Sequence, residues 1–453
     1  MSMPLLVAER DAVVAWRAGA PVSAAQFLAD AARLAERLPT DGQPINLCAD
    51  RYLFAVGFAA ALLRGQTSLM PPNALPETLA RLRETTPALY AISDDLGLDV
   101  GRLERVQVPV DAAPLDRAAC VPRIAGDLVA ACLLTSGSTG VPQPHAKAFG
   151  PLVDNIRAEA ERLAAFIGRP TLAGLNIVAT VPPQHSYGFE SSVLLALLGG
   201  AAFDDSPAFY PADIADALAR LPRPRALVTT PFHLKTLMLS GVALPLLDLL
   251  LCATAPLSPQ LAAQAEQAFG APLVEIYGCT EAGQVASRRT TAGDVWHTLG
   301  ALRVWRETAG SSDEERFIVQ GGHVVVATPL ADVLQLEDAT HFRLLGRAND
   351  LIHVAGKRSS LAHLNYHLNR IDGVHDGAFW LPDEVHDRVV RPVAFVVAPK
   401  LSAAQIVRAL RGSLDAAFVP RRVVFIETLP REATGKLTMQ TLRRFALERL
   451  KVA

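Results

Sequence analysis

Between about residues 45 and 280, short apolar runs alternate with segments of helical pattern, and this alternation limits the possible folds more than any other feature of the chain. Runs rich in Val, Ile and Leu that alternate with Ala-, Leu- and Arg-rich helices are typical of βαβ units, which build largely parallel sheets. We therefore predict an α/β fold. The predicted strands are 45–49, 67–70, 88–92, 105–108, 129–134, 176–181, 225–229, 249–253 and 272–276, and the predicted helices include 52–64, 75–85, 213–221 and 259–269.

The pattern changes twice beyond residue 280. Short strands without long helices between 295 and 345 indicate a small antiparallel or barrel-like element. The chain then continues as a compact α+β unit of about 100 residues, a size typical of an independent domain. We predict a large N-terminal domain, residues 1–346, of layered βαβ subdomains with a β-barrel-like element, and a small C-terminal domain, residues 347–453. The strands predicted in the second unit are 351–354, 373–380, 391–397 and 422–426, and its helices are 361–370 and 403–414.

The amino-acid composition and net charge exclude some classes of binding partner. Half of the residues are apolar, 19% are charged and the net charge is −2, so we expect no nucleic-acid partner and no attraction to an anionic membrane. No apolar run approaches the ~20 residues of a membrane span, so we expect no membrane insertion. The five cysteines form no CxxC pair, which favours a reducing compartment. We expect a soluble, cytoplasmic protein.

A loop of hydroxyls and glycines follows the predicted strand 129–134. Small side chains let the backbone approach an anion, and their N–H and O–H groups can donate hydrogen bonds to phosphate oxygens. It is not a Walker loop, because no Lys-Ser or Lys-Thr pair closes it. The alternative is an ordinary flexible turn. The loop consists of Thr135, Ser136, Gly137, Ser138, Thr139 and Gly140.

A second motif, Tyr277 to Gly283, follows the predicted strand 272–276. Ligands bind beyond the carboxyl ends of parallel strands, so this position suits a nucleotide. The ring of Tyr277 can stack on a base, the Thr280 hydroxyl can meet a phosphate, and the Glu281 carboxylate can hold Mg²⁺. The alternative is a helix start with Thr280 as its N-cap.

Two further motifs carry charge near the predicted domain boundary and the C-terminus. Asp332 and Arg347 could together grip the two hydroxyls of a ribose, although charge-rich turns are more often simply solvated. The loop Leu429 to Lys436 could deliver the Lys436 cation to a reacting phosphate, and its alternative is a surface turn.

In this order and spacing the four motifs resemble the adenylate-forming superfamily of acyl- and aryl-CoA synthetases, peptide-synthetase adenylation domains and luciferases. Segments 182–189 and 252–258 look like the substrate-side loop and the adenine-side strand and turn of that superfamily. The resemblance implies a reaction in two steps. A carboxylate first attacks the α-phosphate of MgATP to give an acyl-adenylate and pyrophosphate. A pantetheine thiol, of CoA or of an acyl carrier protein, then takes the acyl group while a mobile C-terminal domain rotates.

The resemblance also implies the roles of single residues. Lys436 would act as the catalytic cation, with Thr280 and Glu281 at the α-phosphate and Glu281 as the metal ligand. The residues implied for ATP are Thr135, Ser136, Gly137, Ser138, Thr139 and Gly140 with Lys147 at the phosphates, Thr254, Ala255, Pro256 and Tyr277 at adenine, and Asp332 and Arg347 at the ribose. The residues implied for the acid are His185, Tyr187, Gly278 and Cys279, and the domain hinge is placed at Asn349 and Asp350.

The chain departs from the family pattern after the phosphate loop. Gln143 stands where relatives have a lysine, so Lys147 or His145 would have to supply the charge. This compact variant looks most like the stand-alone ligases of aryl-polyene or xanthomonadin-type pigment pathways, which activate an aryl acid such as 4-hydroxybenzoate. The residues around Glu190 argue against an amino acid. The alternatives are a synthetase for medium-chain fatty acids and a non-catalytic adenylate-binding protein.

Overall fold

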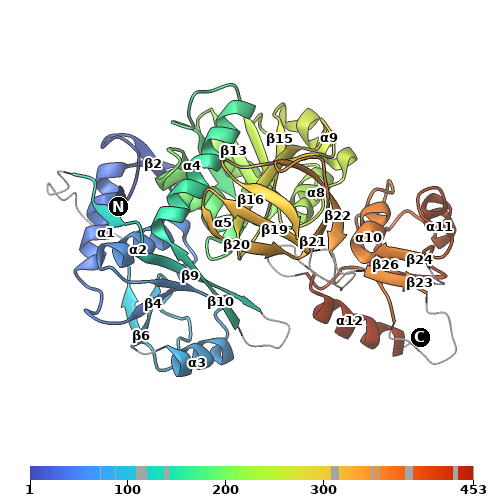
Figure 1. Ribbon diagram of the computed structural model, residues 1–453, viewed down its shortest axis with the longest axis horizontal. Coiled ribbons are helices and arrows are strands. Elements are labelled where there is room, and N and C mark those ends of the chain that lie inside the picture. The colour runs from blue at the N-terminus through green and yellow to red at the C-terminus, as the bar shows by residue number, and fades with distance from the viewer. Residues whose placement is uncertain are drawn as a thin grey trace.

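The computed structural model describes residues 1–71, 73–86, 88–108, 120–136, 142–307, 316–347, 351–354, 357–382, 391–431 and 437–451. Within these residues a six-stranded sheet has the order β10-β9-β5-β4-β6-β7 (Figure 1). Its strands run parallel except for β10, which pairs antiparallel with β9 at one edge. The strands are β4 (Gln43–Asn46), β5 (Ser68–Met70), β6 (Leu89–Ser93), β7 (Glu104–Gln107), β9 (Val129–Ser136) and β10 (Pro142–Ala148).

An eleven-stranded sheet forms the centre of the molecule, with the order β21-β22-β17-β16-β15-β14-β13-β11-β12-β2-β3. The strands from β15 to β2 in this order are parallel, and antiparallel strands extend the sheet at both ends. Its strands are β2 (Val13–Arg17), β3 (Ala20–Ser23), β11 (Asn176–Ala179), β12 (Ala202–Asp204), β13 (Arg225–Thr229), β14 (Leu249–Cys252), β15 (Leu273–Cys279), β16 (Gly283–Arg289), β17 (Trp296–Thr298), β21 (Asp332–Leu336) and β22 (His341–Arg347).

Helices join the two sheets through one buried apolar cluster, which draws side chains from α1, α2, α4 and both sheets. Helix α2 has apolar residues on all its faces and lies almost wholly in this core, as a helix of that pattern must. Strands β1 and β8 pair over only three residues. The helices of this part are α1 (Ala24–Ala35), α2 (Arg51–Leu63), α3 (Pro76–Thr85), α4 (Phe149–Phe166), α5 (Ser186–Gly188), the π-helix η1 (Phe189–Leu194), α6 (Leu195–Leu197), α7 (Pro211–Arg220), α8 (Pro231–Leu239) and α9 (Pro259–Phe269), and the paired strands are β1 (Ser2–Pro4) and β8 (Arg123–Ala125).

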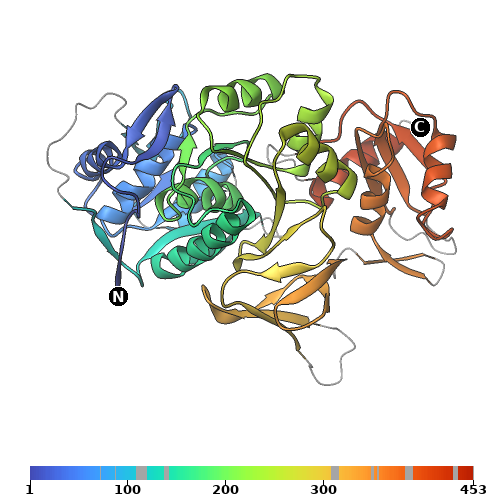
Figure 2. The same cartoon turned by 90° about the horizontal axis from the view of Figure 1, so that it is seen from above.

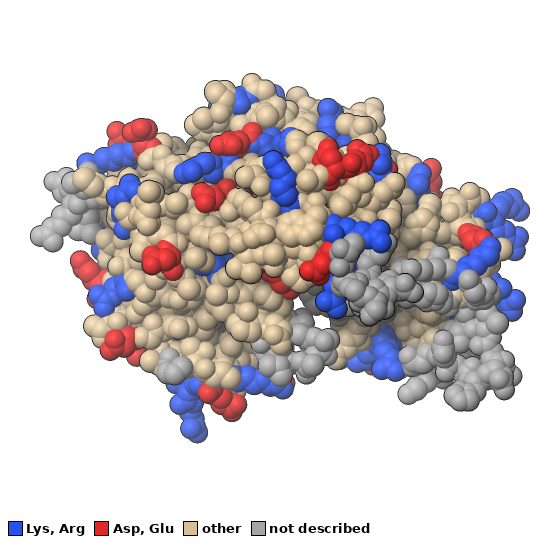
Figure 3. Space-filling model, in the orientation of Figure 1, with Lys and Arg blue, Asp and Glu red and all other residues tan. Residues whose placement is uncertain are grey.

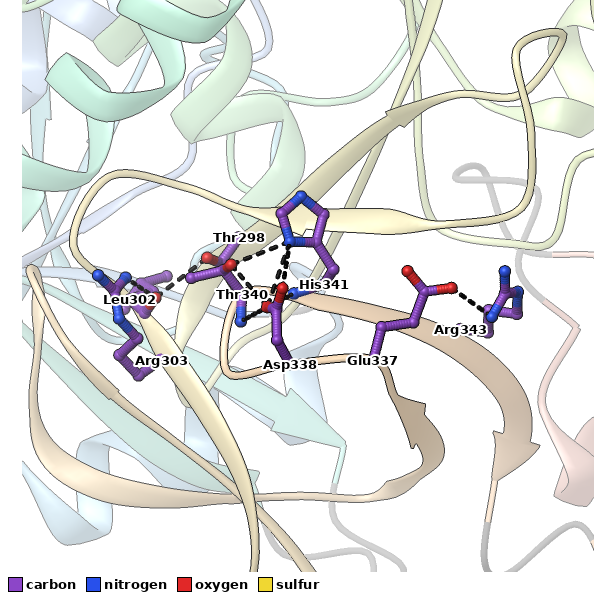
Figure 4. Close-up of polar contacts among 8 residues, drawn as sticks. All are labelled: Thr298, Leu302, Arg303, Glu337, Asp338, Thr340, His341 and Arg343. Carbon is purple, nitrogen blue, oxygen red and sulfur yellow. Dashed lines mark hydrogen bonds and ion pairs between the residues drawn. The ribbon is translucent and has the colours of Figure 1, made fainter.

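A three-stranded antiparallel sheet, β18 (Arg303–Glu307), β19 (Arg316–Gly321) and β20 (Val324–Leu330), packs on the antiparallel end of the central sheet through a separate apolar cluster. The neighbouring hairpin β21–β22 turns at Asp338. This carboxylate accepts hydrogen bonds from the Thr340 amide (2.6 Å) and from its hydroxyl (2.7 Å), and these hold the pKa of Asp338 well below its usual range (Figure 4). Glu337 and Arg343 add an ion pair across the same turn.

The last part of the chain forms its own unit at the end opposite the N-terminus, as Figure 2 shows from above. It has two apolar clusters of its own. Its contacts with the large part involve α8, where Lys235 Nζ donates to the Asn369 carbonyl (3.4 Å) and the Arg431 guanidinium lies 5.6 Å from the centre of the Phe232 ring. Its elements are β23 (Leu351–Val354), β24 (Lys357–Ser360), α10 (Leu361–Asn369), β25 (Asp376–Trp380), β26 (Val393–Val397), α11 (Ala403–Arg411), β27 (Arg422–Phe425) and α12 (Met439–Lys451).

The predicted α/β class is confirmed: the molecule has a large α/β part with parallel sheets and a small α+β part. The predicted elements recur with ends that shift by up to three residues. The predicted helix 403–414, for example, ends at Arg411, with Gly412 as its C-cap residue. Among the described residues, no helix combines the length and the apolar character needed to cross a membrane.

Candidate active site

The candidate site lies where the carboxyl ends of several parallel strands meet. Strand β12 lies on one side of β11 and β13 on the other, so the chain leaves β11 at a point where the strand order reverses. Ligands of open α/β sheets bind in the crevice that such a point creates. The segment after β11 carries His185 and Tyr187, and the ends of β14 and β15 carry Thr254 and Tyr277 nearby in the sheet order.

The hairpin β9–β10 directs three polar side chains to one face of β10. Because side chains alternate along a strand, Gln143, His145 and Lys147 share that face. Thr135 Oγ1 at the end of β9 is hydrogen-bonded to His145 Nε2 (3.1 Å). Thr135 and Ser136 of the predicted loop belong to β9, the paired strand β10 presents the polar groups, and residues 137–141 lie outside the described residues.

This face meets the turn that carries Glu281. Lys147 Nζ donates to the Glu281 carbonyl oxygen (3.0 Å), and His145 Nε2 lies 3.9 Å from Glu281 Oε1. Residues 280–282 form the turn between β15 and β16, so the alternative of a helix start with Thr280 as its N-cap is wrong. The side chain of Glu281 is half exposed, which leaves its carboxylate accessible to a cation. The structure thus brings Thr135, Lys147 and Glu281 together as the sequence suggested.

The adenine-side turn after β14 has an unusual backbone. Thr254 has φ of +81°, a left-handed conformation that costs a β-branched residue about 1–3 kcal/mol. Its Oγ1 is buried without a hydrogen-bond partner, and the next residues, Ala255 and Pro256, are exposed. Backbone strain of this kind gathers at ligand sites, so the turn is a candidate binding element on structural grounds of its own.

Tyr277 and Asp332 are directly linked. The Tyr277 hydroxyl donates to Asp332 Oδ2 (2.8 Å), and the ring packs against Trp296 and Phe342. Asp332 stands opposite Arg347 in the β21–β22 register, so the two predicted ribose residues are neighbours across one ladder. The alternative of an ordinary solvated turn does not describe this pair, because both positions are in paired strands.

Of the four residues predicted to bind the acid, Gly278 and Cys279 lie on β15, and His185 and Tyr187 precede the π-helix η1. A Cβ at Gly278 would come within 2.3 Å of the Gly283 carbonyl oxygen, so no side chain fits there. Burial raises the pKa of the Cys279 thiol to about 12, which makes this cysteine a packing residue rather than a nucleophile. Tyr187 is buried, and His185 precedes the first turn of α5.

Sequence reasoning missed a buried polar cluster behind these residues. Glu159 on α4 and Glu190 on η1 are 0% and 1% exposed. Burial raises the pKa of Glu159 to about 8 and also raises that of Glu190. No motif in the sequence marks Glu159, whose burial depends on how α4 packs in the folded chain.

Several predicted residues cannot be placed beside these groups. Gly137, Ser138, Thr139, Gly140, Asn349, Asp350 and Lys436 lie outside the described residues. For Ser136 and Arg347 the backbone alone is described.

The described residues fit the magnesium ion that the resemblance implies. Mg²⁺ is usually bound through one or two carboxylates together with substrate phosphates and water, rather than by a cage of protein ligands. One half-exposed carboxylate, Glu281, stands next to the loop predicted for phosphate. Within the described part of the chain there is no group of three or more His, Cys, Asp or Glu residues that could hold a metal ion.

Comparisons with known proteins match this arrangement. The model of the AMP-binding enzyme family matches residues 9–307, and that of the AMP-binding enzyme C-terminal domain matches residues 368–436. A 4-coumarate–CoA ligase from Halorhodospira halophila is 30% identical over 312 residues, which cover 67% of this chain and 73% of that enzyme. A 2,3-dihydroxybenzoate–AMP ligase from Bacillus subtilis is 24% identical over 378 residues, 73% of this chain and 66% of that enzyme.

Solved structures agree on the fold. An anthranilate CoA ligase in complex with anthranoyl-AMP superposes with a TM-score of 0.80 over 100% of this chain and 99% of that one, at 15% identity. The family models cover both the large part and most of the small part, in the order that the motifs predicted. The chain belongs to the AMP-binding enzyme family and hence to the adenylate-forming superfamily.

Proposed function

We propose that this protein is an AMP-forming acid–thiol ligase, which activates a carboxylic acid with ATP and passes the acyl group to a pantetheine thiol. The observation that carries the proposal is the meeting of Lys147 and Glu281 at the carboxyl ends of the parallel strands, in a chain of the AMP-binding enzyme family. These two residues join the phosphate hairpin to the turn after β15, which is where an ATP-binding site would have to form.

In the first step a carboxylate oxygen attacks the α-phosphorus of ATP, the bond to the bridging oxygen breaks, and pyrophosphate leaves. Attack of one anion on another needs alignment and charge neutralisation more than acid–base catalysis. Thr280 and Glu281 hold the α-phosphate side, and Lys147 adds positive charge. Lys436 bridges the carboxylate and the α-phosphate as their charge is redistributed. Glu281 would hold Mg²⁺ together with the phosphates, and the ion would supply charge neutralisation for the leaving group.

Asp332, Arg347 and the strained turn at Thr254 position the nucleoside in this scheme. In the second step the thiol attacks the acyl carbonyl, the thioester forms and AMP leaves. The small domain, with its hinge at Asn349 and Asp350, withdraws Lys436 between the two steps, so each face of that domain serves one half-reaction. The acceptor is CoA or the phosphopantetheine of a carrier protein.

An aryl acid, such as 4-hydroxybenzoate, is the proposed substrate. The relatives and the neighbouring structure named above act on coumarate, dihydroxybenzoate and anthranilate, which are all aromatic acids. Within this proposal the protein is a stand-alone aryl acid ligase of the kind found in pigment pathways. A medium-chain fatty acid is the second candidate, and no residue of the described site favours it.

Pyrophosphate release across a panel of aromatic and aliphatic acids tests the proposal. We expect release with one or more aromatic acids, dependent on Mg²⁺, followed by thioester formation when CoA or a holo carrier protein is added. Binding of ATP without release for any acid would favour a non-catalytic adenylate-binding protein. Preferential release with aliphatic acids of medium length would replace the aryl assignment.

A further inference from the structure

Unpaired hydrogen-bond acceptors gather behind the acid side of the site. Three side-chain oxygens there are buried and have no hydrogen-bond partner: Glu159 Oε2, Asn155 Oδ1 and Gln284 Oε1. Their residues are 0%, 2% and 3% exposed. Because an unpaired polar atom in the interior costs the desolvation of that group, native structures satisfy nearly all such atoms. Three acceptors in one place therefore call for an explanation.

Each donor atom of the cluster already makes one hydrogen bond within it. Ser191 Oγ donates to Glu159 Oε1 (2.8 Å) and accepts from Gln284 Nε2 (2.8 Å). Glu190 accepts from Ser186 Oγ (3.1 Å) and from Asn155 Nδ2 (3.2 Å). The protein thus satisfies both oxygens of Glu190 and only one oxygen of Glu159. Because burial raises the pKa of Glu159 to about 8, its protonated carboxyl at neutral pH can donate one hydrogen bond, and the two amide oxygens still outnumber that donor.

The cluster adjoins the acid side of the site. Asn155 and Glu159 are four residues apart on α4, so they lie on one face of that helix. A Cβ at Gly278 would lie 3.0 Å from Gln284 Cα, so Gln284 is directly behind the predicted acid strand. Ser186 belongs to the predicted acid loop. Glu190 and Ser191 come from η1, and π-helical turns occur often at functional sites.

We propose that Asn155, Glu159 and Gln284 receive a hydrogen-bond donor, a hydroxyl or amino group, at the end of the substrate remote from its carboxylate. These three residues, here named the acceptor cluster, would then select acids that carry such a group. The inference rests on the proposed function and adds the chemistry of the acid. A donor from the substrate pairs the orphan oxygens, whereas an acid that ends in hydrogen, methyl or halogen buries them unpaired.

The wild-type protein gives the first test. Benzoates with a hydroxyl or amino group at each ring position are compared with methyl, fluoro and methoxy analogues, and kcat/KM is taken from pyrophosphate release. We expect the best donor-bearing acid to exceed its matched analogue by about 100-fold or more, since sites that hydrogen-bond a substrate group reject analogues that lack it. Release with all acids at similar kcat/KM would overturn the inference and leave the proposed function standing. Absence of release with every acid would overturn the proposed function itself.

Variants locate the preference. Glu159→Gln and, separately, Gln284→Met should each reduce the preference for donor-bearing acids to below about 10-fold. The KM of the acid should rise, whereas the KM of ATP should not change. Glu161→Gln is the matched control, because Glu161 lies on the same helix and is exposed. Thermal unfolding checks that each variant is folded. If one of the two variants does not fold, Asn155→Leu is tested in its place. A preference that survives all the folded variants, as expected if water or a monovalent cation fills the cluster, would contradict the proposal.

Discussion

The large and small parts of this molecule carry opposite charge. Residues 1–346 contain 26 basic and 35 acidic residues, whereas residues 347–453 contain 17 basic and 10 acidic ones, so a chain of net charge −2 divides into parts of −9 and +7. In Figure 3, Lys and Arg side chains gather at the right-hand end, over the small part. Since ATP, the acid and the pantetheine acceptor of the proposed reaction are all anions, we propose that the small part brings positive charge to the site formed by the large part.

The two parts also differ in their interiors. Among the described residues, buried polar side-chain atoms without a partner, such as those of Ser68, Asn155 and Gln284, belong to the large part. The core of the small part is apolar, and its ion pair between Arg431 and Asp376 has two nitrogen–oxygen contacts of 2.7 Å. The difference indicates that recognition is built into the large part, and that the small part is a self-contained carrier of charge.

Lys436→Ala should have the largest effect, because it removes the charge that the small part is proposed to deliver. Adenylation, followed as pyrophosphate release, should fall by about 100-fold or more. Transfer from a chemically prepared acyl-adenylate to the thiol acceptor should largely survive. An equal loss in both assays would break the division of labour between the two parts.

Lys147→Met tests whether the large part supplies its own phosphate charge. We expect the KM of ATP to rise about 10-fold, since a cation near the phosphates is lost while Glu281 remains. Adding Gln143→Lys to this variant should restore most of the affinity, because both positions lie on one face of β10. An ATP KM that does not change in Lys147→Met would show that Gln143 and the loop amides suffice.

Arg421→Glu combined with Arg422→Glu reverses two exposed charges on the small part. The KM of the thiol acceptor should rise several-fold, and the same KM should rise with ionic strength in the wild type as salt screens the surface charges. Arg157→Glu on the exposed side of α4 is the control in the large part. If Arg157→Glu raised the KM of the thiol acceptor as much as the double variant did, the positive charge of the small part would have no specific role.

The smallest effect concerns the contact between the parts. Burial lowers the pKa of Lys235 from its usual 10.5 to about 8, so the unfolded chain binds more protons than the folded one between these values. Stability should therefore increase as pH rises from about 8 to 10.5, and Lys235→Met should lack this increase. Thermal unfolding at pH 7.5, 9 and 10 measures it. A wild type that responds to pH in the same way as the variant would contradict the prediction.

Local signals explain which elements the sequence could predict. Helix α9 was predicted with its observed bounds, because Ser258 caps it, Pro259 starts it and Gly270 ends it in a left-handed conformation. Strand β2 was not predicted, since it is defined by pairing with β12, which lies nearly two hundred residues further along the chain. Pairing between strands so far apart in the chain cannot be predicted from a short stretch of sequence.

The same distinction applies to the site. Thr135, Glu281 and Asp332 were found because each follows or begins a strand within a recognisable motif. The left-handed backbone of Thr254 and the burial of Glu159 depend on elements that meet only in the folded chain. Polar residues that are far apart in the sequence can therefore form a buried cluster in the folded chain.

The register of β9 with β10 restricts how the hydroxyl loop can change in length. Gln143 stands opposite Thr135, and His145 and Lys147 follow on the same face. Because side chains alternate with a period of two, shifting β10 by one residue would turn His145 and Lys147 away from Glu281, whereas a shift by two would retain the alternation. Among functional variants of this hairpin, insertions and deletions should therefore come in pairs of residues.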